Sequence, residues 1–167
     1  MGDRGPQAKV LIAPTAVTGS MTALGDIYNA KILELAAAIA PARRLPAPDA
    51  TATAHSKLCG STVTVDVRLL DHRVVDFAQT VKACLLGQAS ASVMARNIVG
   101  TPVAELRAVA DTMRRMLKER GPPPDGRWSD LAVLEPVRDV KARHASTLLV
   151  FEAVERALTE IEARADA

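Results

Sequence analysis

Between residues 58 and 97 the spacing of apolar residues changes from every second position to a helical period. From Thr62 to Leu70 apolar and polar residues alternate, which is the pattern of a strand with one buried face. After a turn at Leu70–Arg73, Val74–Val81 is again β-prone, so the two segments predict a β-hairpin. Small residues follow, and they predict a helix over about residues 87–98 that opens near Cys84.

Apolar residues recur at helical spacing in four further segments. They predict helices over residues 27–40, from Thr101–Pro102 onward, over Asp130–Glu135 and from about Arg143 to Ala165. The second of these should bury a stripe formed by Leu106, Val109, Met113 and Met116.

Residues with known end preferences mark where these helices start and stop. Gly25-Asp26 can cap the first helix, and Thr101 and Pro102 suit the N-cap and first helical position of the next. Gly100 suits the end of the small-residue helix. Ser129 can cap the short segment, which Pro136 should end.

One more short β-prone segment, Thr51–Ser56, adds a third strand beside the hairpin. Three strands followed by grouped helices predict an α+β fold, in which a three-stranded antiparallel sheet carries helices packed on one side. We expect residues 21–167 to form this single domain and residues 1–20 to be a disordered leader or tag. The apolar patch Val10–Ala13 is too short for a secretion signal.

Composition narrows the function classes. Apolar residues make up 49% of the chain and aromatic residues 2%, so the core should be aliphatic. The net charge of +2 offers no electrostatic footprint for nucleic acid or an anionic membrane. No apolar run approaches the ~18 residues of a membrane-spanning helix. We therefore expect a cytoplasmic protein that binds neither nucleic acid nor membrane.

Two cysteines carry the candidate chemistry. Cys59 precedes the hairpin and Cys84 follows it, and because an antiparallel hairpin brings its ends together, the two thiols should be neighbours. Close cysteines in a reducing compartment bind metal or react more often than they form a disulfide. His144, at the start of the last helix, could add a nitrogen ligand, and two thiolates with an imidazole suit zinc, iron or part of an iron–sulfur cluster.

Simpler interpretations stay open for each residue. A lone cysteine is usually a small buried hydrophobe, and His144 could be a solvated or capping histidine. Ser61 and Ser146 lack the Gly-x-Ser-x-Gly elbow of a hydrolase nucleophile. A thiol-redox protein would carry Cys-x-x-Cys, which is absent.

Several of these segments resemble a known family in order and spacing. The similar segments are Leu58-Cys59-Gly60-Ser61, Ala83-Cys84, Gln88–Met94, Ile98–Thr101 and the first and last helices, around Tyr28–Leu33 and Glu152–Leu158. Together they resemble the NifU/IscU/SufU-type iron–sulfur cluster assembly scaffolds, over nearly everything after Met21. Residues Glu119–Trp128 are similar to the longer SufU branch.

The resemblance implies a site of three cysteines and an aspartate, with a histidine in the IscU branch. Cys59 and Cys84 match the first two cysteines, and His144 matches the histidine. The aspartate after Cys-Gly is Ser61 here, and the third cysteine falls on Ala145 or Ser146. The resemblance thus implies a divergent member in which Ser61 and Ser146 are weaker candidate ligands, because serine is a poor ligand beside thiolate.

The resemblance also implies a function and partners. The scaffolds take sulfur from a cysteine desulfurase, assemble a cluster with iron and pass it to acceptor proteins, acting as carriers rather than enzymes. We expect this chain to bind iron or a nascent cluster through Cys59, Cys84 and His144. The alternative is a zinc-binding or metal-free paralogue that serves as a sulfur-transfer, partner-binding or regulatory module.

Overall fold

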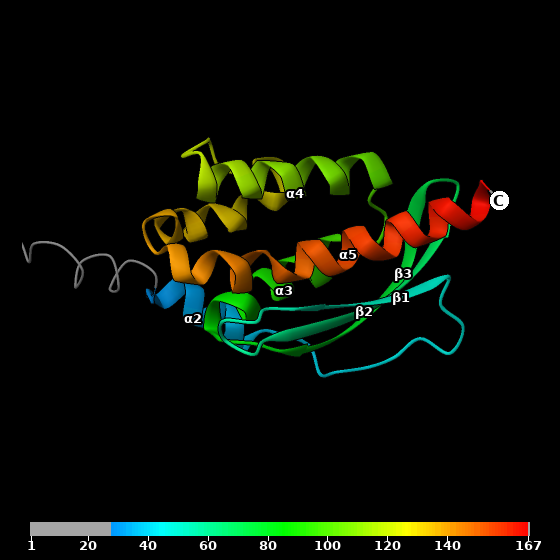
Figure 1. Cartoon of the computed structure of the whole chain (residues 1–167), viewed down its shortest axis with the longest axis horizontal. Coiled ribbons are helices and arrows are strands. Elements are labelled where there is room, and N and C mark those ends of the chain that lie inside the picture. Colours follow the sequence, from blue (N-terminus) through cyan, green and yellow to red (C-terminus); the bar gives the residue numbers. More distant parts are fainter. Residues whose placement is uncertain (1–27, 167) are drawn as a thin grey trace, which may run out of the picture.

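The computed structural model describes residues 28–166. The expected leader, residues 1–20, and the expected cap Gly25-Asp26 lie outside this range. Figure 1 shows the order of the elements, which are α2 (Ala30–Ala37), β1 (Ala50–His55), β2 (Thr62–Leu70), β3 (Arg73–Lys82), α3 (Leu85–Asn97), α4 (Val103–Lys118), the 3₁₀ segments η1 (Gly126–Asp139) and η2 (Lys141–Arg143), and α5 (His144–Ala165).

The three strands form one antiparallel sheet in the order β1-β2-β3, which confirms the predicted sheet and hairpin. The hairpin turns on Asp71 and His72, whose φ angles are +52° and +61°. Two successive residues with positive φ match the right-handed twist of the flanking strands, and Asp and His tolerate this region better than most residues. At the opposite end of the sheet, Thr62 pairs with both His55 and Lys82.

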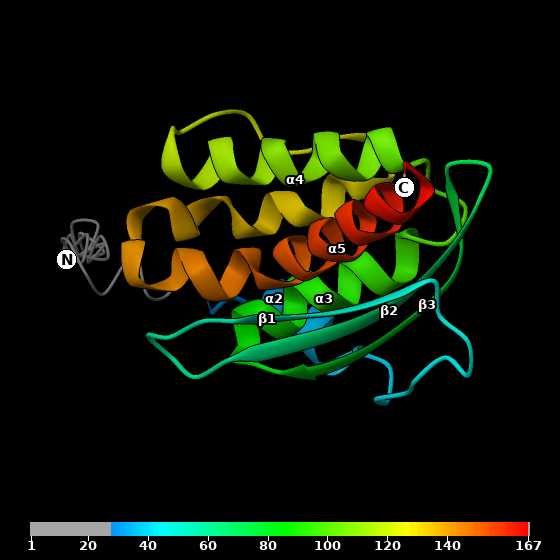
Figure 2. The same ribbon diagram turned by 45° about the vertical axis from the view of Figure 1, so that its right-hand side comes forward.

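The helices pack on one face of the sheet, as predicted, in two layers (Figures 1 and 2). Val63, Val65 and Val67 point into the core from β2 and are fully buried. Helix α5 lies across β1 and β2, and α3 lies against β3. Helix α4 and η1 form the outer layer over α5 and α3. The predicted stripe of α4 is confirmed, because all four of its residues are buried.

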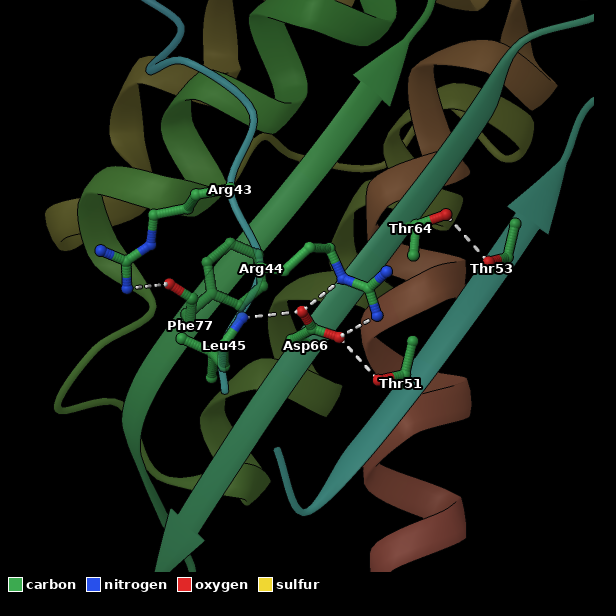
Figure 3. A network of polar contacts seen from close by, with 8 residues as sticks. All are labelled: Arg43, Arg44, Leu45, Thr51, Thr53, Thr64, Asp66 and Phe77. Atoms are coloured by element: carbon green, nitrogen blue, oxygen red, sulfur yellow. Dashed lines mark hydrogen bonds and ion pairs between the residues drawn. The ribbon is translucent and has the colours of Figure 1, made fainter. Parts of the chain in front are cut away.

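The face of the sheet away from the helices is covered at its centre by the segment between α2 and β1. Asp66 points to this face, yet its side chain is only 1% exposed. Arg44 donates to both carboxylate oxygens, at 2.7 and 3.1 Å, while the Leu45 N–H and the Thr51 hydroxyl donate at 3.0 and 2.6 Å (Figure 3). This network fastens the connecting segment to β2. The alternation over residues 62–70 predicts that Asp66 lies on the polar face of β2, and it gives no sign of this cover.

The ends of the first helices differ from the predicted ones. Helix α2 begins at Ala30 instead of residue 27, and the Asn29 carboxamide oxygen caps it by accepting from the Ile32 N–H at 3.0 Å. Pro102 occupies the N-cap position of α4. Thr101 does not cap α4, because its hydroxyl donates to the Asn97 carbonyl at the end of α3. Gly100 has φ +88°, but its N–H donates to Val74 of β3, so it ties α3 to the sheet.

The segment after α4 also corrects a prediction. In place of a short helix that ends at Pro136, a 3₁₀ segment runs through that residue from Gly126 to Asp139. Trp128, Leu131, Leu134 and Val137 are its buried residues, at roughly three-residue spacing, which is the 3₁₀ period. The predicted last helix is confirmed to within one residue at its start. Among residues 28–166, no helix is long and apolar enough to cross a membrane.

Candidate functional site

The two cysteine-bearing loops leave the sheet at the same end. Cys59 lies in the loop between β1 and β2, and Cys84 occupies the N-cap position of α3, directly after β3. Because Thr62 is opposite both His55 and Lys82, the loop that carries Cys59 and the connection that carries Cys84 start from adjacent strand ends. Both cysteines are free thiols.

The loop around Cys59 is a tight turn that surrounds the sulfur with hydroxyl groups. The Ser56 N–H donates to the Ser61 carbonyl and the Gly60 N–H donates to the Ser56 carbonyl, both at 2.9 Å. Gly60 has φ +69°, which a side chain would strain. The Cys59 sulfur consequently lies 3.3 Å from the Ser56 hydroxyl oxygen and 3.0 Å from that of Ser61.

These contacts stabilise a negative charge on sulfur. The Ser56 and Ser61 hydroxyls can donate to the thiolate, and together with the Ser61 backbone they lower the pKa of Cys59 from 9.0 to about 7. The positive charge of Arg143, at the start of α5, contributes in the same direction. Cys59 is exposed, so this loop presents a nucleophilic thiol to solvent.

Cys84 lies partly buried against the first turn of α5. Its thiol donates to the Ser146 hydroxyl oxygen at 3.5 Å, and that hydroxyl donates to the Arg143 carbonyl at 3.2 Å. A glycine permits this contact, because a Cβ on Gly87 would lie 3.1 Å from the Ser146 carbonyl oxygen and 2.7 Å from the Ala83 Cβ. Helices α3 and α5 can approach this closely only without a side chain at residue 87.

The Nε2 atom of His144 contacts the backbone of η1. His144 is 8% exposed, and its Nε2 lies 3.0 and 3.1 Å from the carbonyl oxygens of Val137 and Arg138 in η1. Since carbonyls only accept, Nε2 carries the proton. Over the described part of the chain, no three His, Cys, Asp or Glu side chains are grouped so that they could hold a metal ion. The role of His144 as a third ligand therefore stays a prediction.

The structure thus pairs each thiol with a serine. Ser61 lies beside Cys59 and Ser146 beside Cys84. The positive charge of Arg143 acts on Cys59, and the Arg143 carbonyl accepts from the Ser146 hydroxyl. Two thiolates can bind a soft or borderline metal such as iron or zinc, and hydroxyls add little. Two contributors were missed by sequence reasoning. The only signals for Ser56 and Gly87 were a serine near Cys59 and a glycine within a helix.

Comparison with known proteins shows which family this chain resembles in sequence and fold. No family model matches the sequence. The solved structure of a nitrogen-fixing NifU-like protein (N-terminal) from Brucella abortus is 58% identical, with a TM-score of 0.83, and the match covers 84% of this chain and 98% of that chain. The chain belongs to the NifU/IscU/SufU-type scaffold family.

Two further matches fit this assignment. The iron–sulfur cluster assembly scaffold protein IscU of Thermotoga maritima is 28% identical over 104 residues, which are 62% of this NifU-like chain and 72% of that protein. A structure described as an iron–sulfur cluster assembly scaffold for the SUF system, from Fervidobacterium islandicum AW-1, has a TM-score of 0.73 at 19% identity. It covers 80% of this chain and 98% of that chain, and it shows the shared fold.

Proposed function

We propose that this NifU-like chain is an iron–sulfur cluster assembly scaffold whose cargo, iron or a nascent cluster, is held between Cys59 and Cys84. The observation that carries the proposal is that Cys59 and Cys84, each beside a serine hydroxyl, follow adjacent strand ends at one end of the sheet. Both relatives named as scaffolds for iron–sulfur cluster assembly share this fold or sequence. A cysteine desulfurase would supply sulfur, and acceptor proteins would receive the cluster.

The chemistry follows from the different surroundings of the two sulfurs. Cys59 has a pKa of about 7 and is exposed, so near neutral pH much of it is thiolate, the form that binds metal. Cys84 is more protected and is oriented by Ser146. We assign Cys59 to the first capture of iron or sulfur and Cys84 to closing the site over the cargo. Two thiolates leave iron with unfilled positions, which suits cargo that has to depart.

Anaerobic reconstitution with ferrous iron and sulfide tests the proposal. We expect charge-transfer absorbance in the wild type and its loss in both Cys59→Ala and Cys84→Ala. His144→Ala tests the predicted nitrogen ligand, and His55→Ala, at the end of β1, is its matched control. If His144 ligates, His144→Ala changes the absorbance and His55→Ala does not. A wild-type protein that stays colourless and free of iron would contradict the scaffold function.

One observation favours a second candidate function. The resemblance places a third cysteine at Ala145 or Ser146, neither of which is a cysteine, and the Nε2 of His144 is held by two carbonyls. A site with two thiolates could bind zinc or nothing, and the chain would then act as a sulfur-transfer or partner-binding module. Metal and acid-labile sulfide content after anaerobic purification separates the candidates. Iron with sulfide supports the scaffold, whereas zinc or no metal supports the module.

A further inference from the structure

A basic cavity lies next to the thiol site, on the other side of the first turn of α5. Its volume is about 700 Å³, and it is bordered by the end of α4, the turn between η1 and η2, and the start of α5. It is lined by the basic side chains of Lys118, Arg120, Arg138 and Lys141, by His144, and by the apolar side chains of Leu117 and Ala145. None of its lining residues is acidic.

Two of the four cations are available to a ligand. Arg120 pairs with Asp139 at 2.9 Å, and Arg138 pairs with Glu135 at 3.2 Å while it also donates to the Gly121 carbonyl. The ammonium groups of Lys118 and Lys141 have no ion-pair or hydrogen-bond partner within residues 28–166. They come from different elements, α4 and η2, and both border one cavity. Unneutralised like charges held near one another favour an anionic partner.

The shape of the cavity selects the class of anion. A volume of this size fits the ~300–1,000 Å³ of typical ligand pockets, whereas a lone phosphate would fill a small part of it. Leu117, Ala145 and the aliphatic stems of the lysines add apolar surface between the charges. A peptide that alternates carboxylates with apolar side chains satisfies both features. Recognition of acidic motifs by clusters of basic residues is a common mode of peptide binding.

The cavity lies beside the thiol site, so a peptide bound there would bring its protein close to Cys84. Ala145 and Ser146 are consecutive, and Ala145 lines the cavity while Ser146 contacts the thiol of Cys84. We propose that the cavity docks an acidic segment of the protein that exchanges sulfur or a cluster with Cys59 and Cys84. This inference rests on the proposed scaffold function, because it assigns a partner surface to that site.

Binding of a short fluorescein-labelled peptide of alternating glutamate and leucine, followed by fluorescence anisotropy at low ionic strength, tests the docking. The full-length wild type should bind this peptide and not its glutamine–leucine counterpart. The double variant Lys118→Glu/Lys141→Glu should weaken binding by at least about tenfold, since it turns attraction into repulsion. Arg138 is left in place, because its side chain is only 13% exposed and holds Gly121.

A matched control removes the effect of net charge. Lys31→Glu/Arg68→Glu changes the charge by the same amount at exposed positions of α2 and β2, neither of which lines the cavity. This pair should leave affinity within about twofold, apart from long-range screening effects. Equal weakening by both pairs, no binding by the wild type, or displacement of the peptide by an equal concentration of pyrophosphate would each overturn the inference.

The same assay separates this inference from the proposed function. Peptide binding is measured without iron or sulfide, and it should persist in Cys59→Ala/Cys84→Ala, because neither thiol lines the cavity. A wild type that binds the peptide but gives no cluster absorbance on reconstitution would therefore count against the scaffold function alone. Intact absorbance with no peptide binding would count against the docking surface alone.

Discussion

The Cys84 thiol donates to the Ser146 hydroxyl oxygen at 3.5 Å, across 62 residues of sequence. The Ser146 side chain is buried, whereas the preceding residue, Ala145, is exposed. The third cysteine implied by the family resemblance could fall on either residue. The contact with Cys84 selects Ser146 as the position that faces this thiol.

We therefore predict that Ser146→Cys completes a three-thiolate site. The change replaces one heavy atom at a buried position and puts a good ligand where a poor one stands. Zinc and iron retention should rise to near stoichiometric levels, measured as metal per protein after dialysis against a weak chelator. Metal retention in the wild type should be lower.

Ala145→Cys is the control for this prediction. It adds the same thiol one position away, on the exposed face that borders the basic cavity. Its metal retention should match that of the wild type. Equal gains in both variants would show that any added thiol suffices and that Ser146 has no special position.

The hairpin and its thiols show how far the sequence alone can predict this site. Alternation of Val63, Val65 and Val67 defined β2, and the hairpin placed Cys59 and Cys84 at one end of the sheet. Cys59 meets serines of its own loop, whereas the group that Cys84 meets belongs to α5, more than sixty residues downstream. Local patterns carry no information on that packing, so the ring orientation of His144 and the fit at Gly87 could not be predicted.

A second prediction concerns Gly87. In a helix, alanine normally stabilises relative to glycine by about 1 kcal/mol. Here the added Cβ would lie 2.7 Å from the Ala83 Cβ and 3.1 Å from the Ser146 carbonyl oxygen, and overpacking costs about 1–3 kcal/mol. We expect Gly87→Ala to lower the free energy of unfolding by about 1 kcal/mol, as measured by urea denaturation, and to alter the alkylation rate of Cys84.

Gly100→Ala supplies the comparison for Gly87. Gly100 has φ +88° with open space around its Cβ position, so alanine there should cost about 1 kcal/mol through backbone strain alone. It should leave the alkylation rate of Cys84 unchanged, because Gly100 is at the other end of α3. A Gly87→Ala protein that is more stable than the wild type would show that α3 and α5 can separate without cost.

The pH dependence of Cys59 gives a third prediction. Its alkylation by iodoacetamide, measured in a Cys84→Ser background, should rise with pH around a midpoint near 7. Ser56→Ala and Ser61→Ala should each move the midpoint upward, since each removes a hydroxyl that stabilises the thiolate. Ser129→Ala, an exposed serine of η1, should not. A midpoint that neither Ser56→Ala nor Ser61→Ala changes would contradict the assigned cause.

The same titration has a consequence for stability. The pKa of Cys59 is lower in the folded protein, about 7, than its ordinary value of 9.0. The favourable contribution of the Cys59 thiolate to folding is therefore complete above pH 9 and is lost as pH falls through 7. The difference in unfolding midpoint between the wild type and Cys59→Ala should accordingly grow from pH 6 to pH 9 and then stay level.

The alternation of apolar and polar residues predicts the face on which Asp66 lies but not the groups that contact it. The pattern places it correctly on the face away from the helices, but its environment comes from Arg44 and Leu45, in a connection without regular structure. Burial by itself raises the pKa of Asp66, and the contacts with Arg44, Thr51 and the Leu45 N–H outweigh it, so the pKa lies below 3.8. A buried carboxylate with this many donors fixes where the connecting segment lies.

We predict that Asp66→Asn destabilises the fold by about 2 kcal/mol. The amide removes the charge and turns an N–H₂ group toward donors that need an acceptor, those of Arg44, Thr51 and the Leu45 backbone. Urea denaturation measures the loss, and limited proteolysis should show faster cleavage between α2 and β1. Because the folded pKa is lowered, the contribution of Asp66 is present above pH 3.8 and is lost at lower pH.

Asp76→Asn is the matched control, since Asp76 lies on the same face of the neighbouring strand and pairs with Arg43 at 3.1 Å. That carboxylate is 42% exposed, and exposed ion pairs contribute only about 0–1 kcal/mol. The control should therefore stay within about 0.5 kcal/mol of the wild type and resist proteolysis equally well. If both variants lost the same stability, burial of Asp66 would not be what fastens the connecting segment to the sheet.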